Sequence, residues 1–364
     1  MARNIVKSNI VGVAVNHDSD DAFSTDDLEL RLFMAVQDLN YSIQIPRQQL
    51  KQVGTQDFGI QSIVSQPDVE LSLTYLAQPD LANEYNSNFI GEAAVYTKFN
   101  NYFSGVTQNS NNFYAFIAKD QGQDIFDTLT FDESSINLTG FDVIAFGNCY
   151  PTTYGLSYSI GSLPIVSTNY ISSNVVVENL TGVSMQSPAI NLTGGNNVNV
   201  GRCDFKFEAN TPDDKSPLIM NPTNTGSSIK LENLQVGGQN LSGTHFVQSV
   251  DMSVDLTRTS NYGLGNDYAF DRKAQFPANG TFRVSSLVSG LDSGLISGVL
   301  KSDKNYNFDL TLEVSGKQLI YKIEDAKLNT YNYGIAVNGN MTFDADFGFQ
   351  VTETKGLKIS GSNY

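Results

Sequence analysis

Several residue types that carry chemistry in proteins are scarce in this sequence. Among its 364 residues there is no tryptophan, and there are only two cysteines, Cys149 and Cys203, and two histidines, His17 and His245. Two cysteines cannot form a disulfide framework or a four-cysteine zinc site. Two histidines are too few for a multi-histidine metal centre and leave little scope for histidine-based catalysis.

Positive charge is also scarce, since 22 Lys and Arg residues stand against 38 Asp and Glu residues, a formal net charge of −16. Electrostatic attraction to nucleic acid needs the opposite sign. No apolar stretch approaches the ~20 residues of a membrane helix. The segment Met1–Ser8 has no apolar core of a secretory signal. We therefore expect a soluble protein made in the cytoplasm, with no membrane partner.

Known catalytic and ligand-binding motifs are missing or incomplete. The acidic run Asp18–Asp21 fails as an EF-hand loop, because its fifth and sixth positions hold Ala22 and Phe23. The glycines of Gly263–Gly265 are not followed by a third, and there is no nucleophile elbow or P-loop. A pair of carboxylates would suffice for a glycosidase, but nothing singles out two of the 38 acids. We predict no enzyme, and we assign no catalytic, cofactor-binding or metal-binding residue.

What the sequence does contain is the pattern of a mostly β protein. Apolar and polar residues alternate over Leu39–Ile45, Val69–Tyr75, Tyr154–Ile160 and Met341–Val351, which is the period of a half-buried strand. The 30 glycines, 17 tyrosines and 22 phenylalanines fit short strands with tight turns. Only Glu92–Gly105, and more weakly Leu28–Ala35, have spacing that favours a helix.

The chain also resembles itself. One offset, which we call the first offset, lays Val36–Gly54 on Val247–Gly265 without a gap, with five of nineteen residues identical and the apolar alternation in phase. A shorter, second offset lays Thr153-Tyr154 and the following strand on Thr330-Tyr331. Because the second offset is shorter than the first, the first copy is expected to carry an insertion between its motifs, at about residues 80–112.

The repeat predicts a division of the chain into four parts. These are an N-terminal arm (1–26), a first β domain (27–172), a β-rich connecting region (173–241) and a second β domain (242–364). The connecting region is too long for a plain linker and has strand-like pieces at Asn174–Val177, Arg202–Phe207 and Ser228–Leu231. Tandem β domains on an acidic chain without catalytic motifs suggest a subunit of an assembly.

The repeated motif resembles the tail tube proteins of long-tailed bacteriophages. It is a strand ending in Arg-x₆-Gly, followed by proline and a second alternating strand: Val36–Gly54 with Pro67–Tyr75, and Val247–Gly265 with Pro277–Val284. Gly147–Tyr154, followed by Gly161–Pro164, resembles a stretch found in phage virion structural proteins. The resemblance covers about two thirds of the chain, and it implies two tandem tail-tube-like β-barrel or sandwich domains with little helix.

The resemblance also implies a function. Tail tube proteins form stacked rings whose inner sheets line a channel for the genome during ejection. With two domains per chain, three chains would make a pseudo-hexameric, homotrimeric ring. The implied partners are other copies of the chain, the tape measure and tail terminator proteins, and double-stranded DNA that passes without specific binding. The implied location is the tail of the virion.

In that setting, the polar faces of the two repeated strands are candidates for the channel wall. They contain no Lys or Arg, and their residues are Asp38, Asn40, Ser42 and Gln44 in the first copy and Ser249, Asp251, Ser253 and Asp255 in the second. An acidic or neutral wall would bind the passing genome weakly. The other interpretation is that these are ordinary solvent-exposed faces of strands.

Two questions stay open at this point, one about a pair of arginines and one about the protein as a whole. Arg47 and Arg258, at equivalent ends of the repeated strand, could each reach a carboxylate of the next subunit, or could form an intradomain salt bridge or lie in solvent. The protein as a whole could instead be another virion component, such as a capsid-decorating or head–tail joining protein. A carbohydrate-binding or carbohydrate-degrading tail protein is a further alternative.

Overall fold

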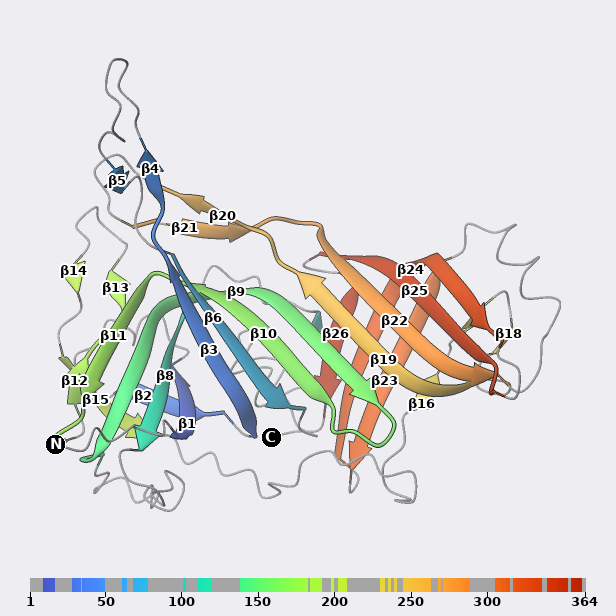
Figure 1. Ribbon diagram of the computed structural model, residues 1–364, viewed down its shortest axis with the longest axis horizontal. Coiled ribbons are helices and arrows are strands. Elements are labelled where there is room, and N and C mark those ends of the chain that lie inside the picture. The colour runs from blue at the N-terminus through green and yellow to red at the C-terminus, as the bar shows by residue number, and fades with distance from the viewer. Residues whose placement is uncertain are drawn as a thin grey trace.

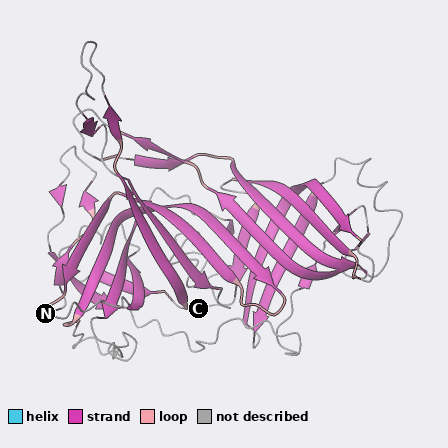
Figure 2. Ribbon diagram, viewed as in Figure 1, coloured by secondary structure: helices cyan, strands magenta, loops and turns pink. Residues whose placement is uncertain are grey.

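The computed structural model shows a protein built from strands. It describes residues 9–16, 28–33, 35–49, 61–63, 68–77, 101–102, 110–118, 138–182, 184–191, 198–199, 202–207, 230–232, 235–236, 239–240, 245–262, 268–269, 271–288, 305–314, 317–335, 339–352 and 355–361. Within these ranges there are 26 strands and no helix (Figure 2). The expected mostly β class is confirmed.

The weaker of the two helix predictions is wrong. Leu28–Leu32 forms strand β2, because Leu28, Leu30 and Leu32 alternate with Glu29 and Arg31 and the strand pairs with two others. Of the stronger candidate, Glu92–Gly105, the described part is Asn101–Tyr102, which is strand β7. The rest of it lies outside the described residues, as does most of the expected insertion at 80–112.

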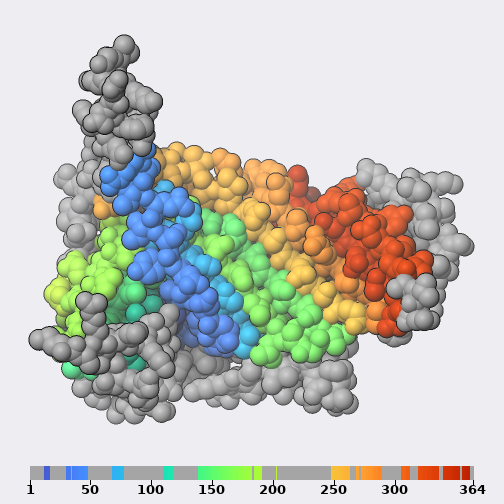
Figure 3. Space-filling model, viewed as in Figure 1, coloured from blue at the N-terminus to red at the C-terminus, as the bar shows by residue number. Residues whose placement is uncertain are grey.

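One antiparallel sheet of eight strands, which we call the main sheet, runs through most of the molecule (Figure 1). Its strands follow in the order β3 (Val36–Gln44), β6 (Asp68–Leu76), β10 (Ile165–Ser172), β9 (Phe141–Ser159), β19 (His245–Asp255), β22 (Ala278–Val288), β25 (Thr342–Val351) and β24 (Lys317–Gly334). Figure 3 shows them as successive bands from blue to red across one face.

The two longest strands, β9 and β24, also belong to a second layer behind the main sheet. The N-terminal half of β9 pairs with β8 (Asn111–Ala118) and β11 (Asn174–Asn179), and the corresponding half of β24 pairs with β23 (Tyr306–Val314) and β26 (Leu357–Gly361). On one side, the pairing continues from β8 into β1 (Asn9–Asn16), β2 (Leu28–Leu32), β15 (Arg202–Phe207) and β12 (Ser184–Gln186). On the other side, β23 pairs with β16 (Lys230–Glu232), and β26 pairs with β7 (Asn101–Tyr102).

The strands before and after the middle of the main sheet pair in the same order. The series β3-β6-β10-β9, with β8 and β11 on the N-terminal half of β9, has its counterpart in β19-β22-β25-β24 with β23 and β26. The register is also the same, since Leu39 faces Leu73 while Val250 faces Val284, and the first offset relates both members of the pair.

The irregularities of the two series coincide as well. A bulge at Gln37 in β3 recurs at Gln248 in β19, its equivalent by the first offset. A bulge at Thr152 in β9 recurs at Asn329 in β24, its equivalent by the second offset. The structure thus reproduces both offsets of the sequence repeat, and bulges are specific features of a strand pairing rather than accidents.

Each series also carries a short two-stranded hairpin beyond its first strand. Strand β4 (Arg47–Gln49) pairs with β5 (Gln61–Ile63), and β20 (Arg258–Asn261) pairs with β21 (Asp271–Ala274). Arg47 faces Ile63 as Arg258 faces Ala274, so this register is repeated too. The remaining short strands form two further hairpins, β13–β14 and β17–β18: Ile190–Asn191 with Val198–Asn199, and Gln235–Val236 with Gln239–Asn240.

The inner face of the main sheet packs on the second layer and forms a continuous hydrophobic core. Aromatic rings dominate it, with Phe113 against Tyr170 in one part and Phe282 stacked on Phe308 in the other. The two parts meet where the hydroxyls of Tyr154 and Tyr321 hydrogen-bond at 2.7 Å in a buried position. Because this face is buried, the opposite face of the main sheet is left to polar residues.

The expected connecting region, residues 173–241, contains strands, as the sequence indicates, and the first of them, β11, belongs to the first series. The three strand-like pieces correspond to β11, β15 and β16. Strand β11 pairs with β9, β15 with β2, and β16 with β23, so these strands add to the second layers.

Candidate functional site

The eight residues proposed for a channel wall lie on one face of the main sheet. Strand register links the two sets: Asp38 faces Thr74, Thr74 faces Ser167, Ser167 faces Gly155, and Gly155 faces Ser253. Directly opposed residues in neighbouring strands point to the same side. The two strands β3 and β19 thus contribute to one surface, which we call the polar face.

The polar face is exposed and mainly acidic. Asp38, Asn40, Ser42, Gln44, Asp251 and Asp255 are exposed, while Ser249 and Ser253 are half-buried. Register adds further charged residues from the neighbouring strands to this face: Asp68, Glu70, Asp344 and Asp346 among the acids, and Arg283 and Lys327 among the bases. Acidic side chains therefore outnumber basic ones on the polar face.

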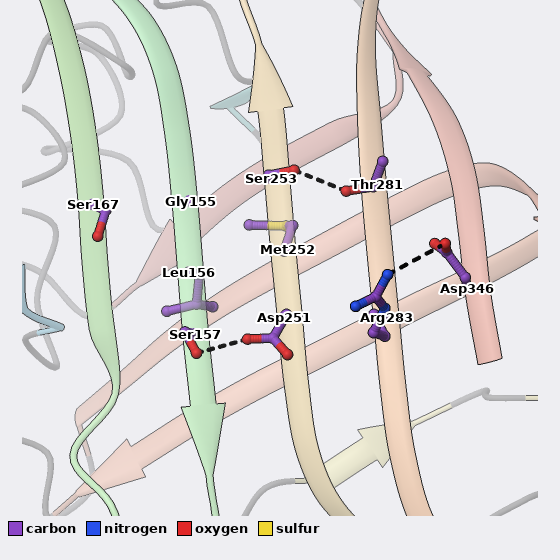
Figure 4. A pocket seen from close by; sticks show the side chains of 10 residues that line it. All are labelled: Gly155, Leu156, Ser157, Ser167, Asp251, Met252, Ser253, Thr281, Arg283 and Asp346. Carbon is purple, nitrogen blue, oxygen red and sulfur yellow. Dashed lines mark hydrogen bonds and ion pairs between the residues drawn. The ribbon is translucent and has the colours of Figure 1, made fainter. Parts of the chain in front are cut away.

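Short polar side chains on this face hydrogen-bond to one another across neighbouring strands (Figure 4). The hydroxyl of Ser157 donates to Oδ1 of Asp251 at 2.6 Å, and the hydroxyls of Ser253 and Thr281 lie 2.8 Å apart. Arg283 lies 3.7 Å from a carboxylate oxygen of Asp346. These groups surround a hollow beside Gly155, which has no side chain to fill it.

A second hollow on the polar face extends over β3, β6 and β10 and is lined by Asn40, Ser42, Glu70, Ser72 and Asn169 among others. Nearby, Nε2 of Gln44 donates to a carboxylate oxygen of Glu70 at 3.1 Å, and Nδ2 of Asn169 donates to the hydroxyl of Thr153 at 2.7 Å. The polar groups are thus engaged with one another along the sheet. What the face offers chemically is a broad, solvent-exposed surface with an excess of negative charge.

The two equivalent arginines have different surroundings. Arg258 donates from Nε to the carbonyl of Pro151 at 2.6 Å and from an Nη to the carbonyl of Arg272 at 2.9 Å, and its guanidinium lies over the ring of Tyr150. Arg47 is exposed. The described partners of Arg258 are thus carbonyls and a ring within the chain, whereas the expected contact of Arg47 with a neighbouring subunit stays a prediction.

The sequence does not reveal a partly buried ion pair that lies close to Arg258. Arg272, in β21, is buried and donates from an Nη to Oδ1 of Asp68 at 2.8 Å. It joins the hairpin of the second series to the first series. No local pattern could have indicated this pair, since its members are far apart in the chain.

Cys149 is the cysteine whose side chain the structure describes, and it is not a reactive thiol. Cys149 is buried in the core, and this burial raises the pKa of its thiol to about 12. Cys203 lies in β15, and its side chain is outside the described residues. His17 and the acidic run Asp18–Asp21 are outside them as well.

Within the described ranges, no group of three or more His, Cys, Asp or Glu side chains is arranged to hold a metal ion. In the same ranges, no helix has the length and apolar character needed to cross a membrane.

Comparisons with known proteins find no family model that matches the chain and no curated protein that matches it.

Proposed function

We propose that this protein is a structural subunit of a bacteriophage tail tube, forming rings that stack around a channel through which the genome passes. The ring would be a homotrimer with pseudo-six-fold symmetry, because each chain contributes two similar β domains. Its permanent partners are other copies of itself. The tape measure and tail terminator proteins and the transiting duplex DNA are the further partners that this function requires.

The observation that supports the proposal most strongly is the repeated strand pairing. Two series of six strands have the same order, the same register and bulges at the same positions. The last strand of the first series, β9, pairs with the first strand of the second, β19. A unit that joins its own copy edge to edge can join further copies in the same way, and rotation then closes a ring.

The charge of the polar face agrees with a channel wall. Duplex DNA carries one negative charge per ~1.7 Å of its axis, so a basic wall would hold it by many phosphate contacts. The polar face offers few such contacts, because its acidic side chains outnumber Arg283 and Lys327. Screening confines the repulsion to within ~8–10 Å of the wall at ordinary salt, so the DNA would stay mobile without being excluded from a wider channel.

Negative-stain electron microscopy of the purified full-length protein tests the proposal. Light scattering first identifies a protein concentration at which large assemblies form. At that concentration, we expect the images to show open-ended tubes built of stacked rings. Particles that are only monomers or single rings at every concentration and salt tested would contradict the tube, and would favour a role in capsid decoration or head–tail joining.

The channel wall predicts an effect of charge reversal. In the triple variant Asp38→Lys, Asp251→Lys, Asp255→Lys, the tubes should still assemble, since all three side chains are exposed. Short duplex DNA at about 50 mM salt should then co-sediment with the tubes at least about tenfold more than with the wild type, and salt should release it.

The matched control is the Asn variant at the same three positions, which removes the negative charge without adding a positive one. Its DNA retention should lie between those of the wild type and the Lys variant. If the Lys variant forms tubes that retain no more DNA than the wild type, these residues do not line the channel.

A further inference from the structure

The main sheet ends at two strands that have one partner each. Among the described residues, β3 pairs only with β6, and the segment Thr330–Gly334 of β24 pairs only with β25. An unpaired strand edge presents a row of free backbone N–H and C=O groups and is a template for a further strand. In Figure 1 these two strands lie at opposite ends of the main sheet.

In the middle of the same sheet, the last strand of the first series pairs with the first strand of the second series, whereas the two edge strands have no such partner among the described residues. Strands β9 and β19 pair over Thr153–Ser159 and Ser249–Asp255, with Val250 facing Tyr158 and Val254 facing Tyr154. Backbone hydrogen bonds from Leu256 to Thr152, at 2.6 Å, and from Ile160 to Gln248, at 2.8 Å, close the pairing at its two ends. We call this contact the internal seam.

The two free edges are the repeat counterparts of the two strands in the internal seam. Strand β3 corresponds to β19 by the first offset, and the end of β24 corresponds to the end of β9 by the second. The two free edges of one chain are therefore complementary to each other in the same way as the two strands that pair in the internal seam.

Apolar residues that are buried in the internal seam have exposed counterparts at the two free edges, as is typical of an interface that no partner covers. In the internal seam Met252 is 2% exposed and Val254 is 0% exposed, whereas their counterparts Tyr41 and Ile43 are 42% and 51% exposed. On the other side, Tyr158 is 4% exposed and its counterpart Ile335 is 74% exposed. Apolar residues that the seam buries are thus left open at both edges.

We propose that a second copy of this chain docks its β24 edge on β3 in the register of the internal seam. This rests on the proposed ring-forming function and names the surface that would carry it. Shifting the seam by the two repeat offsets opposes Leu39, Tyr41 and Ile43 to Ile335, Tyr333 and Tyr331 of the partner subunit, and opposes Asn40, Ser42 and Gln44 to Gly334, Asn332 and Thr330 of the partner subunit.

The opposed side chains are compatible in this register. All three core-side pairs are apolar: one joins two aliphatic residues, one joins two tyrosines, and one joins an isoleucine to a tyrosine. Aromatic pairs and aromatic–β-branched pairs stabilise cross-strand contacts. The pairs on the polar face contain no charged residue, so no like charges meet. A register slipped by a single position would turn the exposed apolar side chains of one strand toward the polar face of the other.

The same shift gives Arg47 a partner. Its counterpart Arg258 donates to the carbonyl of Pro151, at the bulge of β9. The equivalent carbonyl at the bulge of β24 is that of Leu328, so the exposed guanidinium of Arg47 would lie over the carbonyl of Leu328 of the partner subunit. The expected inter-subunit contact of Arg47 is then with a backbone carbonyl rather than with a carboxylate.

Cysteine cross-linking tests the register directly. The hydrogen bonds that close the internal seam belong to the core-side pairs, so the polar-face pairs lie between them, with Cα atoms about 4.5 Å apart, a distance a disulfide can span. Within one chain the edges are separated by seven strand spacings, about 34 Å, so a cross-link between them joins two chains.

We expect the full-length double variant Ser42→Cys, Asn332→Cys to give a ladder of covalent oligomers under mild oxidation. A mixture of the two single variants should give covalent dimers only, and the wild type, which keeps Cys149 and Cys203, should give none. The matched control is Asn40→Cys, Thr330→Cys, which is displaced along the strands by about 13 Å and should cross-link with a yield at least about tenfold lower.

The outcomes separate this inference from the proposed function. If tubes form but the Ser42–Asn332 pair cross-links no better than the control, the register is wrong while the tube stands. If the pair cross-links and microscopy shows no tubes, the seam between chains stands and the tail-tube function falls.

Discussion

Replacing Ile43 by Lys is expected to prevent assembly while leaving the chain folded. Ile43 is 51% exposed in β3, so the single chain tolerates a charge there. Pairing with a second copy would bury that charge in the seam, at a cost of several kcal/mol. Taking about 3 kcal/mol, the concentration needed for assembly should rise roughly 100-fold. Light scattering against protein concentration measures the shift.

Two comparison variants show whether the effect belongs to the edge. Val177→Lys replaces another exposed apolar residue, 64% exposed in β11 and away from both edges, and should assemble like the wild type. Val254→Lys alters the buried counterpart of Ile43 and should instead unfold the chain, as circular dichroism would report. Assembly of Ile43→Lys at wild-type concentration would mean that β3 is not an interface.

Replacing Gly147 by Ala is expected to destabilise the fold by about 3 kcal/mol. A Cβ at Gly147, in β9, would collide with the backbone carbonyl of Pro188. That carbonyl cannot easily move, because Nδ2 of Asn174 donates to it at 3.0 Å. The carbonyl of Gly147 is itself held by the backbone N–H of Ser173 and the hydroxyl of Ser172. Denaturant titration, followed by circular dichroism, measures the loss in the free energy of unfolding.

The same strand supplies the control. A Cβ at Gly155 would lie 3.7 Å from the carbonyl oxygens of Met252 and Ser167, an ordinary van der Waals distance. Gly155→Ala should therefore change the free energy of unfolding by no more than about 0.5 kcal/mol. Equal stability of the two variants would contradict the close packing of β9 on the segment around Pro188.

Local sequence patterns were sufficient to locate some of the strands but not all of them. Alternation over Leu39–Ile45 and Met341–Val351 locates β3 and β25, because the period of two is a property of a single strand. The same period is present in Leu28–Leu32, yet a competing helix-like spacing obscured it. Residues Leu28–Leu32 form a strand because they pair with β1 and β15, and no local pattern indicates this pairing.

By itself, the sequence determined the mostly β class, the scarcity of groups for histidine, cysteine and metal chemistry, and the existence of a repeat. These follow from composition and from spacing along the chain, which need no knowledge of contacts. It also determined that the polar sides of β3 and β19 lack positive charge.

Only the tertiary structure decided that β9 pairs with β19, that both polar strand faces share one surface, and that Arg272 meets Asp68. Each depends on backbone or side-chain hydrogen bonds between segments that lie far apart in the sequence. A strand with a regular alternation can pair with many others, so its partner is chosen by how the whole core closes. That choice is also what leaves Tyr41 and Ile43 of β3, and Ile335 next to the end of β24, exposed at the two ends of the sheet.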